Sequence, residues 1–332
     1  MSRKNGGIIG PANTPVGGLI TGLAGGVWRM NDVANFVGNS QWPKVPENID
    51  NSLRFNSGSS DNLSKSLSTP TNDKKFTFSC WFKKSKNATE MNLFGYQPSG
   101  NAEAYIGFST SDEIRYADRD SGDTTAEIFL VSNAKLRDVS AWYHVVVSVD
   151  TTQGTDSNRA KLYLNGEQIT SLANSTYPSQ NYTPEMNSSD GTKVIGADNN
   201  GNYFNGYIAE TVFIDGQQLD PTSFGEFDTT TGIWKPKKIG QIANAGTNSF
   251  YLDFKDSSNV GKDASGLSNN FTVNNLTSID QSTDTCVVNH ATINPLTPAT
   301  ATLSEGNLKF ANSATNHKGV VGTFGASSGK WY

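Results

Sequence analysis

The chain has 332 residues, more than the roughly 250–300 at which a single hydrophobic core stops growing, so more than one structural unit is expected. Hydrophobic residues make up 35% and charged residues 17%, with 32 glycines and much Asn, Ser and Thr. This mixture favours short strands joined by turns over helical bundles. A net charge of −5, a pI near 5.3 and the lack of a basic patch argue against a nucleic-acid partner.

Three further classes are disfavoured by the sequence. No run approaches the ~18 apolar residues of a membrane span, so membrane insertion is not expected. The N-terminus lacks the apolar stretch of a secretory signal. A secreted scaffold held by disulfides is not expected either. Cys80 and Cys286 lie far apart, and Cys80 alternates with phenylalanines along a strand-like run, so both are expected to be free thiols.

Residues 1–50 are expected to form an N-terminal arm with one short helix. Residues 1–26 are rich in Gly and Pro and cannot fold alone, yet they are too apolar for a solvated linker. Such an arm either anchors the chain to a partner particle or packs on its own domain. A helix is expected within 27–42 from apolar residues at helical spacing. The candidate anchoring residues are Ile8, Ile9, Leu19, Ile20, Leu23 and Trp28.

Residues 51–219 are expected to form an antiparallel two-sheet sandwich. Residues 142–150 alternate and are rich in β-branched side chains, and residues 160–166 end in Asn-Gly, a tight-turn signal, so the two runs predict a hairpin. Phe55, Phe78, Val147 and Leu162 are expected inside. The other expected strands are 53–55, 76–83, 103–109, 113–117, 126–131, 193–195 and 205–214.

The remainder is expected to contain a connector and further β-structure. Residues 220–248 have the Pro and Gly content of a connector. Residues 249–254 alternate and are expected to open another β unit, so 249–332 is interpreted as a second, incomplete β region.

Catalytic signals are poor. His144 lies opposite the Val145, Val147 and Val149 face of its strand, whereas His290 and His317 lie in Asn- and Thr-rich loops. No Cys/His metal spacing appears. The expected strands carry isolated acids, whereas a glycan hydrolase needs two carboxylates at defined spacing. Glu210 is therefore interpreted as a structural hydrogen-bonding carboxylate, and the chain is expected not to be an enzyme.

Calcium is the one cofactor that the sequence raises. Asp118, Asp120 and Asp123 alternate in a Gly-containing stretch, as in loops that fold oxygens around a hard cation. The alternative is a polar hairpin turn between the strands at 113–117 and 126–131.

Several motifs in order resemble the laminin-G/concanavalin-A-like jelly-roll superfamily. They are Leu53-Arg54-Phe55, the Phe76–Lys83 run, Trp142–Asp150 with Leu162–Gly166, Asn205–Ile214 and Gln218-Leu219. This fold hosts lectins, adhesins, glycanases and inert modules, so it does not fix a function. The resemblance implies that loop aromatics near Asn residues are sugar-binding candidates: Tyr177, Tyr182, Tyr203 and Phe204.

A wider resemblance is to marine bacteriophage structural proteins. It rests on Gly25-Gly26-Val27-Trp28 and on the connector from Phe227 to Lys237, while Thr302–Leu308 and Ser328–Tyr332 resemble the opening strands of a SPRY-type sandwich. It implies a virion location, as head fibre, decoration protein or tail fibre. The expected partners are capsid, portal or tail proteins, further copies of the chain and a host-surface glycan. The rival readings are a secreted or surface lectin and a polysaccharide-degrading glycanase.

Overall fold

The computed structural model describes residues 49–98, 102–198, 200–229, 231–239, 244–296, 302–311 and 319–325. The expected arm, its helix and its six anchoring residues lie outside these ranges, as does the end of the SPRY-like stretch. The described chain is all-β, with two large antiparallel sheets and short 3₁₀ turns. No described helix is long and apolar enough to span a membrane.

Sheet A has seven strands in one row and an eighth that pairs alongside. Its spatial order is β10 (Glu167–Gln168), β9 (Ala160–Leu164), β8 (Tyr143–Asp150), β3 (Lys75–Lys84), β13 (Gly206–Asp215), β1 (Ser52–Phe55) and β18 (Gln281–Ser282), while β16 (Phe250–Leu252) also pairs with β13. The predicted hairpin is confirmed as β8–β9, because Val145 lies opposite Leu164 and Val147 opposite Leu162.

Sheet B has eight strands. Their order is β11 (Leu172–Thr176), β7 (Ile128–Lys135), β6 (Glu113–Arg119), β5 (Glu103–Phe108), β4 (Met91–Gln97), β12 (Thr192–Ile195), β2 (Asn62–Ser66) and β17 (Thr272–Asn274). Two small hairpins complete the described strands, β14 (Gly225–Phe227) with β15 (Trp234–Pro236) and β19 (Thr302–Ser304) with β20 (Lys309–Ala311).

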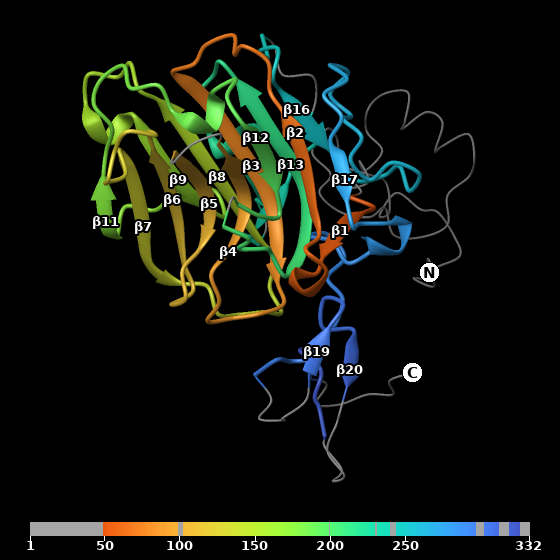
Figure 1. Ribbon diagram of the computed structural model, residues 1–332. Helices are drawn as coiled ribbons and strands as arrows, with labels where there is room; N and C mark the ends of the chain where they lie inside the picture. Colours follow the sequence, from red (N-terminus) through yellow and green to blue (C-terminus); the bar gives the residue numbers. More distant parts are fainter. Residues whose placement is uncertain are drawn as a thin grey trace, which may run out of the picture. The chain divides into compact units, whose positions relative to one another are not determined.

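The two sheets pack face to face over an aromatic core (Figure 1). Phe78 of sheet A stacks on Phe94 of sheet B with ring centroids 4.8 Å apart, and Phe82 meets Phe108 at 5.1 Å. The four residues predicted to be inside, Phe55, Phe78, Val147 and Leu162, are each at most 1% exposed. The jelly-roll sandwich expected from the alternating strands is therefore confirmed.

The region after residue 248 differs from the expectation of another β unit. Its first three strands join the sandwich: β16 pairs with β13, β17 with β2 and β18 with β1. Phe250 stacks on Phe213 of β13 at 5.6 Å and is fully buried. These strands are two or three residues long, so they bury apolar surface by extending existing sheets rather than by forming a separate core.

The predicted connector covers the outer face of sheet A. Trp234, at the start of β15, is 7% exposed and packs with Ile49, Trp81 and Ala209. Its ring fills the space over Gly166, where an added Cβ would lie 2.4 Å from a ring carbon. Gly166 has a φ of +84°, so the Asn-Gly turn predicted from the sequence also makes room for the tryptophan.

Candidate functional site

The outer faces of the two sheets differ in what lies on them. On sheet A, Val146, Tyr163, Val212 and Ile214 are buried together with Phe224 of the connector. On sheet B, the outward side of β5 and β6 carries Tyr105, which is 7% exposed, together with the half-buried Glu103, Arg115 and Arg119. This surface is the candidate site and is called the Tyr105 face. It comprises Glu90, Glu103, Tyr105, Arg115, Arg119 and the Asp198–Tyr203 loop.

Tyr105 occupies the centre of this face. Ala104, Ile106 and Phe108 of β5 belong to the core, so the alternating Tyr105 points to the outer side. Its cross-strand neighbours are Gly95 on β4 and Ala117 on β6. Both neighbours are small, and Tyr105 is only 7% exposed, so most of its ring is covered. Burial raises the pKa of Tyr105 to about 12, so its hydroxyl is a protonated hydrogen-bond donor at neutral pH.

Two arginine–carboxylate pairs lie beside the ring. Arg115 stands opposite Gly107, and its guanidinium carbon is 4.7 Å from the Tyr105 ring centroid, within cation–π range. Arg115 also forms an ion pair with Glu90. Arg119 pairs with the cross-strand Glu103 at 2.9 Å. The face therefore offers planar donors and acceptors, the groups that recognise arrays of hydroxyls, next to an aromatic ring.

Asp198 fixes a loop against the edge of this face. Its carboxylate accepts hydrogen bonds from the backbone N–H groups of Asn200 (2.8 Å) and Asn202 (3.1 Å) and from the side-chain amides of Asn202 and Asn92 (both 2.7 Å). The carbonyl of Ala197 lies so close to Gly95 that an added Cβ would be 2.3 Å from it. The loop is thus seated on β4 beside Tyr105.

The structure separates the four predicted sugar-binding aromatics. Tyr203 forms an isolated bridge with Asn92, which lies opposite Gly107 of β5, so Tyr203 is half-buried at the rim of the Tyr105 face. Phe204 is fully buried against Phe55 and Phe108, so its ring cannot stack on a ligand, and its assignment as a sugar contact was wrong.

The other two aromatics pack inward on the sandwich. Tyr182 is 8% exposed in the core, where its hydroxyl donates to Asp118 Oδ1 (2.8 Å), so most of its ring is covered and its role as a sugar contact stays a prediction. Tyr177 is half-buried against the core. In both cases the aromatic fills space under a long loop.

The predicted calcium ligands are also dispersed. Asp118 is fully buried and accepts hydrogen bonds from the Tyr182 hydroxyl and from the backbone N–H groups of Glu185 (2.9 Å) and Met186 (3.2 Å). Burial raises the pKa of Asp118 to about 7, against the lowering effect of these donors. Asp120 is half-buried and Asp123 exposed in the following turn. Within the described ranges, no three Asp, Glu, His or Cys side chains form a group that could hold a metal ion.

His144 lies under the cover of sheet A. Trp234 Nε1–H donates to His144 Nδ1 (3.1 Å), so the other ring nitrogen carries the proton and donates to Ser79 Oγ (2.8 Å). In this tautomer His144 cannot take a proton from Ser79, which excludes a Ser–His nucleophile pair here. Burial lowers the pKa of His144 to about 3, so the ring is neutral.

Glu210 and the cysteines take the structural roles predicted for them. Glu210 sits at a bulge of β13 with a φ of +48°, and its Oε2 accepts a hydrogen bond from the Tyr251 hydroxyl (2.5 Å). This contact agrees with the interpretation of Glu210 as a structural carboxylate. Cys80 and Cys286 are both free thiols, as predicted, and burial raises the pKa of each well above its usual value.

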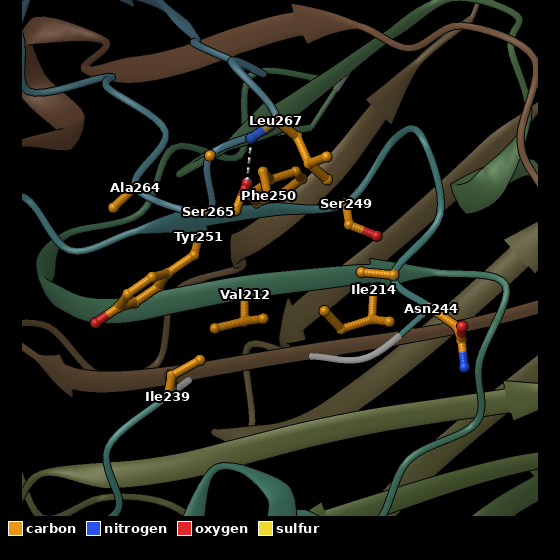
Figure 2. A pocket seen from close by; sticks show the side chains of 12 residues that line it. Val212, Ile214, Ile239, Asn244, Ser249, Phe250, Tyr251, Ala264, Ser265 and Leu267 are labelled. Carbon is orange, nitrogen blue, oxygen red and sulfur yellow. Dashed lines mark hydrogen bonds between the residues drawn. The ribbon is translucent and has the colours of Figure 1, made fainter. Parts of the chain in front are cut away.

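A pocket lies on the sheet A side, at the edge formed by β13 and β16. The pocket has a volume of about 490 Å³. In Figure 2, Tyr251, Val212 and Ile214 lie between Leu267 on one side and Ile239 on the other. The backbone N–H of Leu267 donates to Ser265 Oγ (3.2 Å) at its border. Its lining residues include no Asp, Glu, Lys, Arg or His, so it lacks the charged groups that make the Tyr105 face the stronger candidate.

The fold is an antiparallel two-sheet jelly-roll sandwich. Residues 56–220 match the family model described as the concanavalin A-like lectin/glucanases superfamily. The chain therefore contains a concanavalin A-like jelly-roll domain, and this agrees with the resemblance seen in the sequence. No curated protein matches the chain.

Several solved structures are similar in fold. A SAP-like pentraxin from Limulus polyphemus is 14% identical and has a TM-score of 0.38, with 52% of this chain and 79% of that chain covered. A putative carbohydrate-binding protein from Bacteroides ovatus is 18% identical at a TM-score of 0.48, with 73% and 61% covered. The CBM40 of Ruminococcus gnavus IT-sialidase, bound to α2,3-sialyllactose, is 14% identical at 0.32, with 41% and 72% covered. None is close enough to transfer a ligand or an activity.

Proposed function

We propose that this chain is a non-catalytic carbohydrate-binding protein and that the Tyr105 face is its binding surface. The observation that carries the proposal is the arrangement of Tyr105 with Arg115 and two arginine–carboxylate pairs on an outer sheet face. A sugar presents arrays of adjacent hydroxyls, and the half-buried arginines and carboxylates of this face are planar groups that can hydrogen-bond them, while the buried Tyr105 ring supports Arg115 through a cation–π contact.

Asn92 is fully buried beneath the same place. Its Oδ1 lies over Gly107, where an added Cβ would be 1.9 Å from it. This oxygen is buried and has no hydrogen-bond partner among the described residues. The oxygen is not accessible to a ligand, so Asn92 acts on this face by holding Asp198 through its Nδ2 group (2.7 Å).

The absence of catalysis is part of the proposal. Of the described carboxylates beside Tyr105, Glu90 and Glu103 are each engaged by an arginine, and Asp198 accepts four hydrogen bonds from Asn92, Asn200 and Asn202. A glycan hydrolase instead needs one carboxyl group that protonates the leaving oxygen and a second that acts as nucleophile or base. Incubation of the full chain with polysaccharides, followed by assay for reducing ends, tests this point. Sugar release that is lost in Glu90→Gln or Glu103→Gln would contradict it.

The binding proposal is tested with the full chain on an array of neutral, uronic-acid and sialylated oligosaccharides. Wild-type protein is expected to bind a subset of these glycans, and Arg115→Ala is expected to reduce that binding about tenfold or more, since it removes a charged hydrogen-bond donor. Lys262→Ala is the matched control, because it removes a cation whose described ion pair is with Asp256. Loss of binding in Lys262→Ala, or none in wild-type protein, would contradict the proposal.

We further propose that the chain is a virion structural protein that displays this surface to host glycans. The support is the sequence resemblance of the Gly/Pro arm and of the 227–237 connector to bacteriophage structural proteins. Weak single sites gain strength when many copies are displayed on one particle. Peptides of this chain are expected in mass spectra of purified particles. Their presence only in a secreted or cell-surface fraction would favour the lectin alternative.

A further inference from the structure

Lys83 of β3 has an unusual set of partners. Its side chain is 1% exposed on the outer face of sheet A. The Nζ atom contacts Asp284 Oδ2 at 2.9 Å, Asn289 Oδ1 at 2.8 Å and the His290 carbonyl at 2.7 Å. A buried amine, a side-chain carboxamide and a side-chain carboxyl group therefore meet at one point, although Lys83 and Asn289 are 206 residues apart in the sequence.

Asp284 and Asn289 are each held in place by further hydrogen bonds, made by atoms that do not contact Lys83. Asp284 Oδ1 accepts hydrogen bonds from Trp142 Nε1 (3.0 Å) and from the backbone N–H of His290 (3.2 Å). The Asn289 Nδ2 group donates to the Ser140 carbonyl (2.7 Å). These contacts keep the carboxamide oxygen toward Lys83 and its nitrogen away. Because the amine and the carboxamide are already held together, the reaction does not need an encounter between two free reactants. Intramolecular reactions gain most of their rate in this way.

We propose that Lys83 and Asn289 form an intramolecular isopeptide bond, with Asp284 as the proton relay. A proton first passes from the Lys83 ammonium to the Asp284 carboxylate, which leaves a neutral amine. The lone pair on Nζ then attacks Cγ of Asn289 and forms the new C–N bond. Asp284 protonates the departing Nδ2 group, the Cγ–Nδ2 bond breaks and ammonia leaves, while Asp284 takes up the excess proton on Nζ.

The reaction balances without any other reagent. The amine and the carboxamide give a secondary amide and ammonia, with no oxidation or reduction. Ammonia can leave because Asn289 is exposed, whereas the amine and the relay carboxyl are buried. A lysine in a dry environment is a competent nucleophile once it is neutral, because water no longer competes for its lone pair.

Two other fully buried lysines show what is particular to Lys83. Lys84 contacts Asp112 Oδ1 (2.8 Å) and the Leu136 carbonyl (2.9 Å), so one carboxyl group would have to be both electrophile and relay. Lys193 contacts Ser188 Oγ (3.2 Å) and the Asp190 carbonyl (2.9 Å). Among the described contacts of these three lysines, those of Lys83 alone include both a carboxamide and a separate carboxyl group. The bond would fasten the 284–290 segment to β3 covalently.

Intact mass spectrometry of the denatured full chain tests the proposal. Loss of ammonia lowers the mass by about 17 Da relative to the sequence. Proteolysis is expected to yield a branched peptide that joins the Lys83 and Asn289 segments. Lys83→Arg, which keeps the charge, and Asn289→Ala are expected to show their full sequence masses. Asp284→Asn, which removes the relay but keeps a hydrogen-bonding group, is expected to show no branched peptide.

Lys84→Arg is the matched control and is expected to retain the deficit of about 17 Da. An unmodified wild-type mass, with Lys83 and Asn289 recovered in separate peptides, would overturn the proposal. A branched peptide in Asp284→Asn would overturn the role of Asp284. The mass and the peptides of the wild-type protein test the bond by themselves. The proposal can therefore be decided even if a variant fails to fold.

Discussion

The outer faces of sheet A and sheet B are built from similar alternating strands, but the described residues of the connector cover the face of sheet A and not that of sheet B. On sheet A, Trp234 and Phe224 of the connector bury Trp81, Val146 and Val212. On sheet B, the corresponding outward positions carry Glu103, Tyr105 and Arg115, and the loop at Asp198 borders them. One face thus extends the hydrophobic core, and the other keeps the groups that a polar ligand needs. The covered face stabilises the fold, and the sheet B face is the one that we propose binds a ligand.

The largest expected effect tests the covered face. Trp234→Ala would remove a buried indole and leave His144 Nδ1 without its donor, so we expect the free energy of unfolding to fall by about 3–5 kcal/mol. Phe227→Ala is the control from the same hairpin. Phe227 packs edge-on against Trp234 but is 46% exposed, so a loss below about 1 kcal/mol is expected. Similar losses for both variants in urea denaturation would mean that Trp234 is not part of a core.

Two adjacent residues give a second test of the division between core and surface. Phe204 is fully buried between Phe55 and Phe108, so Phe204→Ala should lower the free energy of unfolding by about 3–5 kcal/mol. Tyr203→Ala, at the rim of the Tyr105 face, should cost less than about 1 kcal/mol but weaken glycan binding. A larger loss of stability in Tyr203→Ala than in Phe204→Ala would contradict this placement. So would a Tyr203→Ala variant that loses glycan binding only because it unfolds.

A pH titration measures how dry the covered face is. The pKa of His144 is about 3 in the folded protein and near 6.5 when unfolded. As the pH falls from 6.5 towards 3, the unfolded chain binds a proton that the folded chain does not, so folding stability decreases by about 1.4 kcal/mol per pH unit from this residue. A His144→Gln variant should show a flatter decline between pH 6 and 4. Equal slopes would mean that His144 is hydrated and titrates normally.

The sequence predicted the sandwich because its long strands alternate. Residues 143–150 and 76–83 show period-2 patterns dense enough to define a face, and the structure places them as neighbours in sheet A. The strands β16, β17 and β18 were not assigned to the sandwich. They are two or three residues long, and their partners lie far away in the sequence, so no local pattern indicates which sheet they extend.

The candidate site was largely missed because its members look ordinary in the sequence. Tyr105 and Arg115 are outward residues of strands that were predicted, but nothing in one strand shows that its neighbour places Gly95 beside Tyr105. The available signal was the polar and aromatic alternation Glu103, Tyr105, Gly107. Loop aromatics beside Asn were favoured instead. Phe204 shows why that choice fails, since a loop residue can turn inward to fill the core.

Hydrogen–deuterium exchange of the full chain, with and without the best-binding oligosaccharide from the array, tests the central claim most directly. The account predicts that the ligand slows exchange in β5, β6 and the loop after Asp198, leaves the 224–236 hairpin unchanged, and loses this effect in Tyr105→Ala while the protein stays folded. Slowed exchange confined to the connector side of sheet A, or binding that survives Tyr105→Ala undiminished, would contradict it.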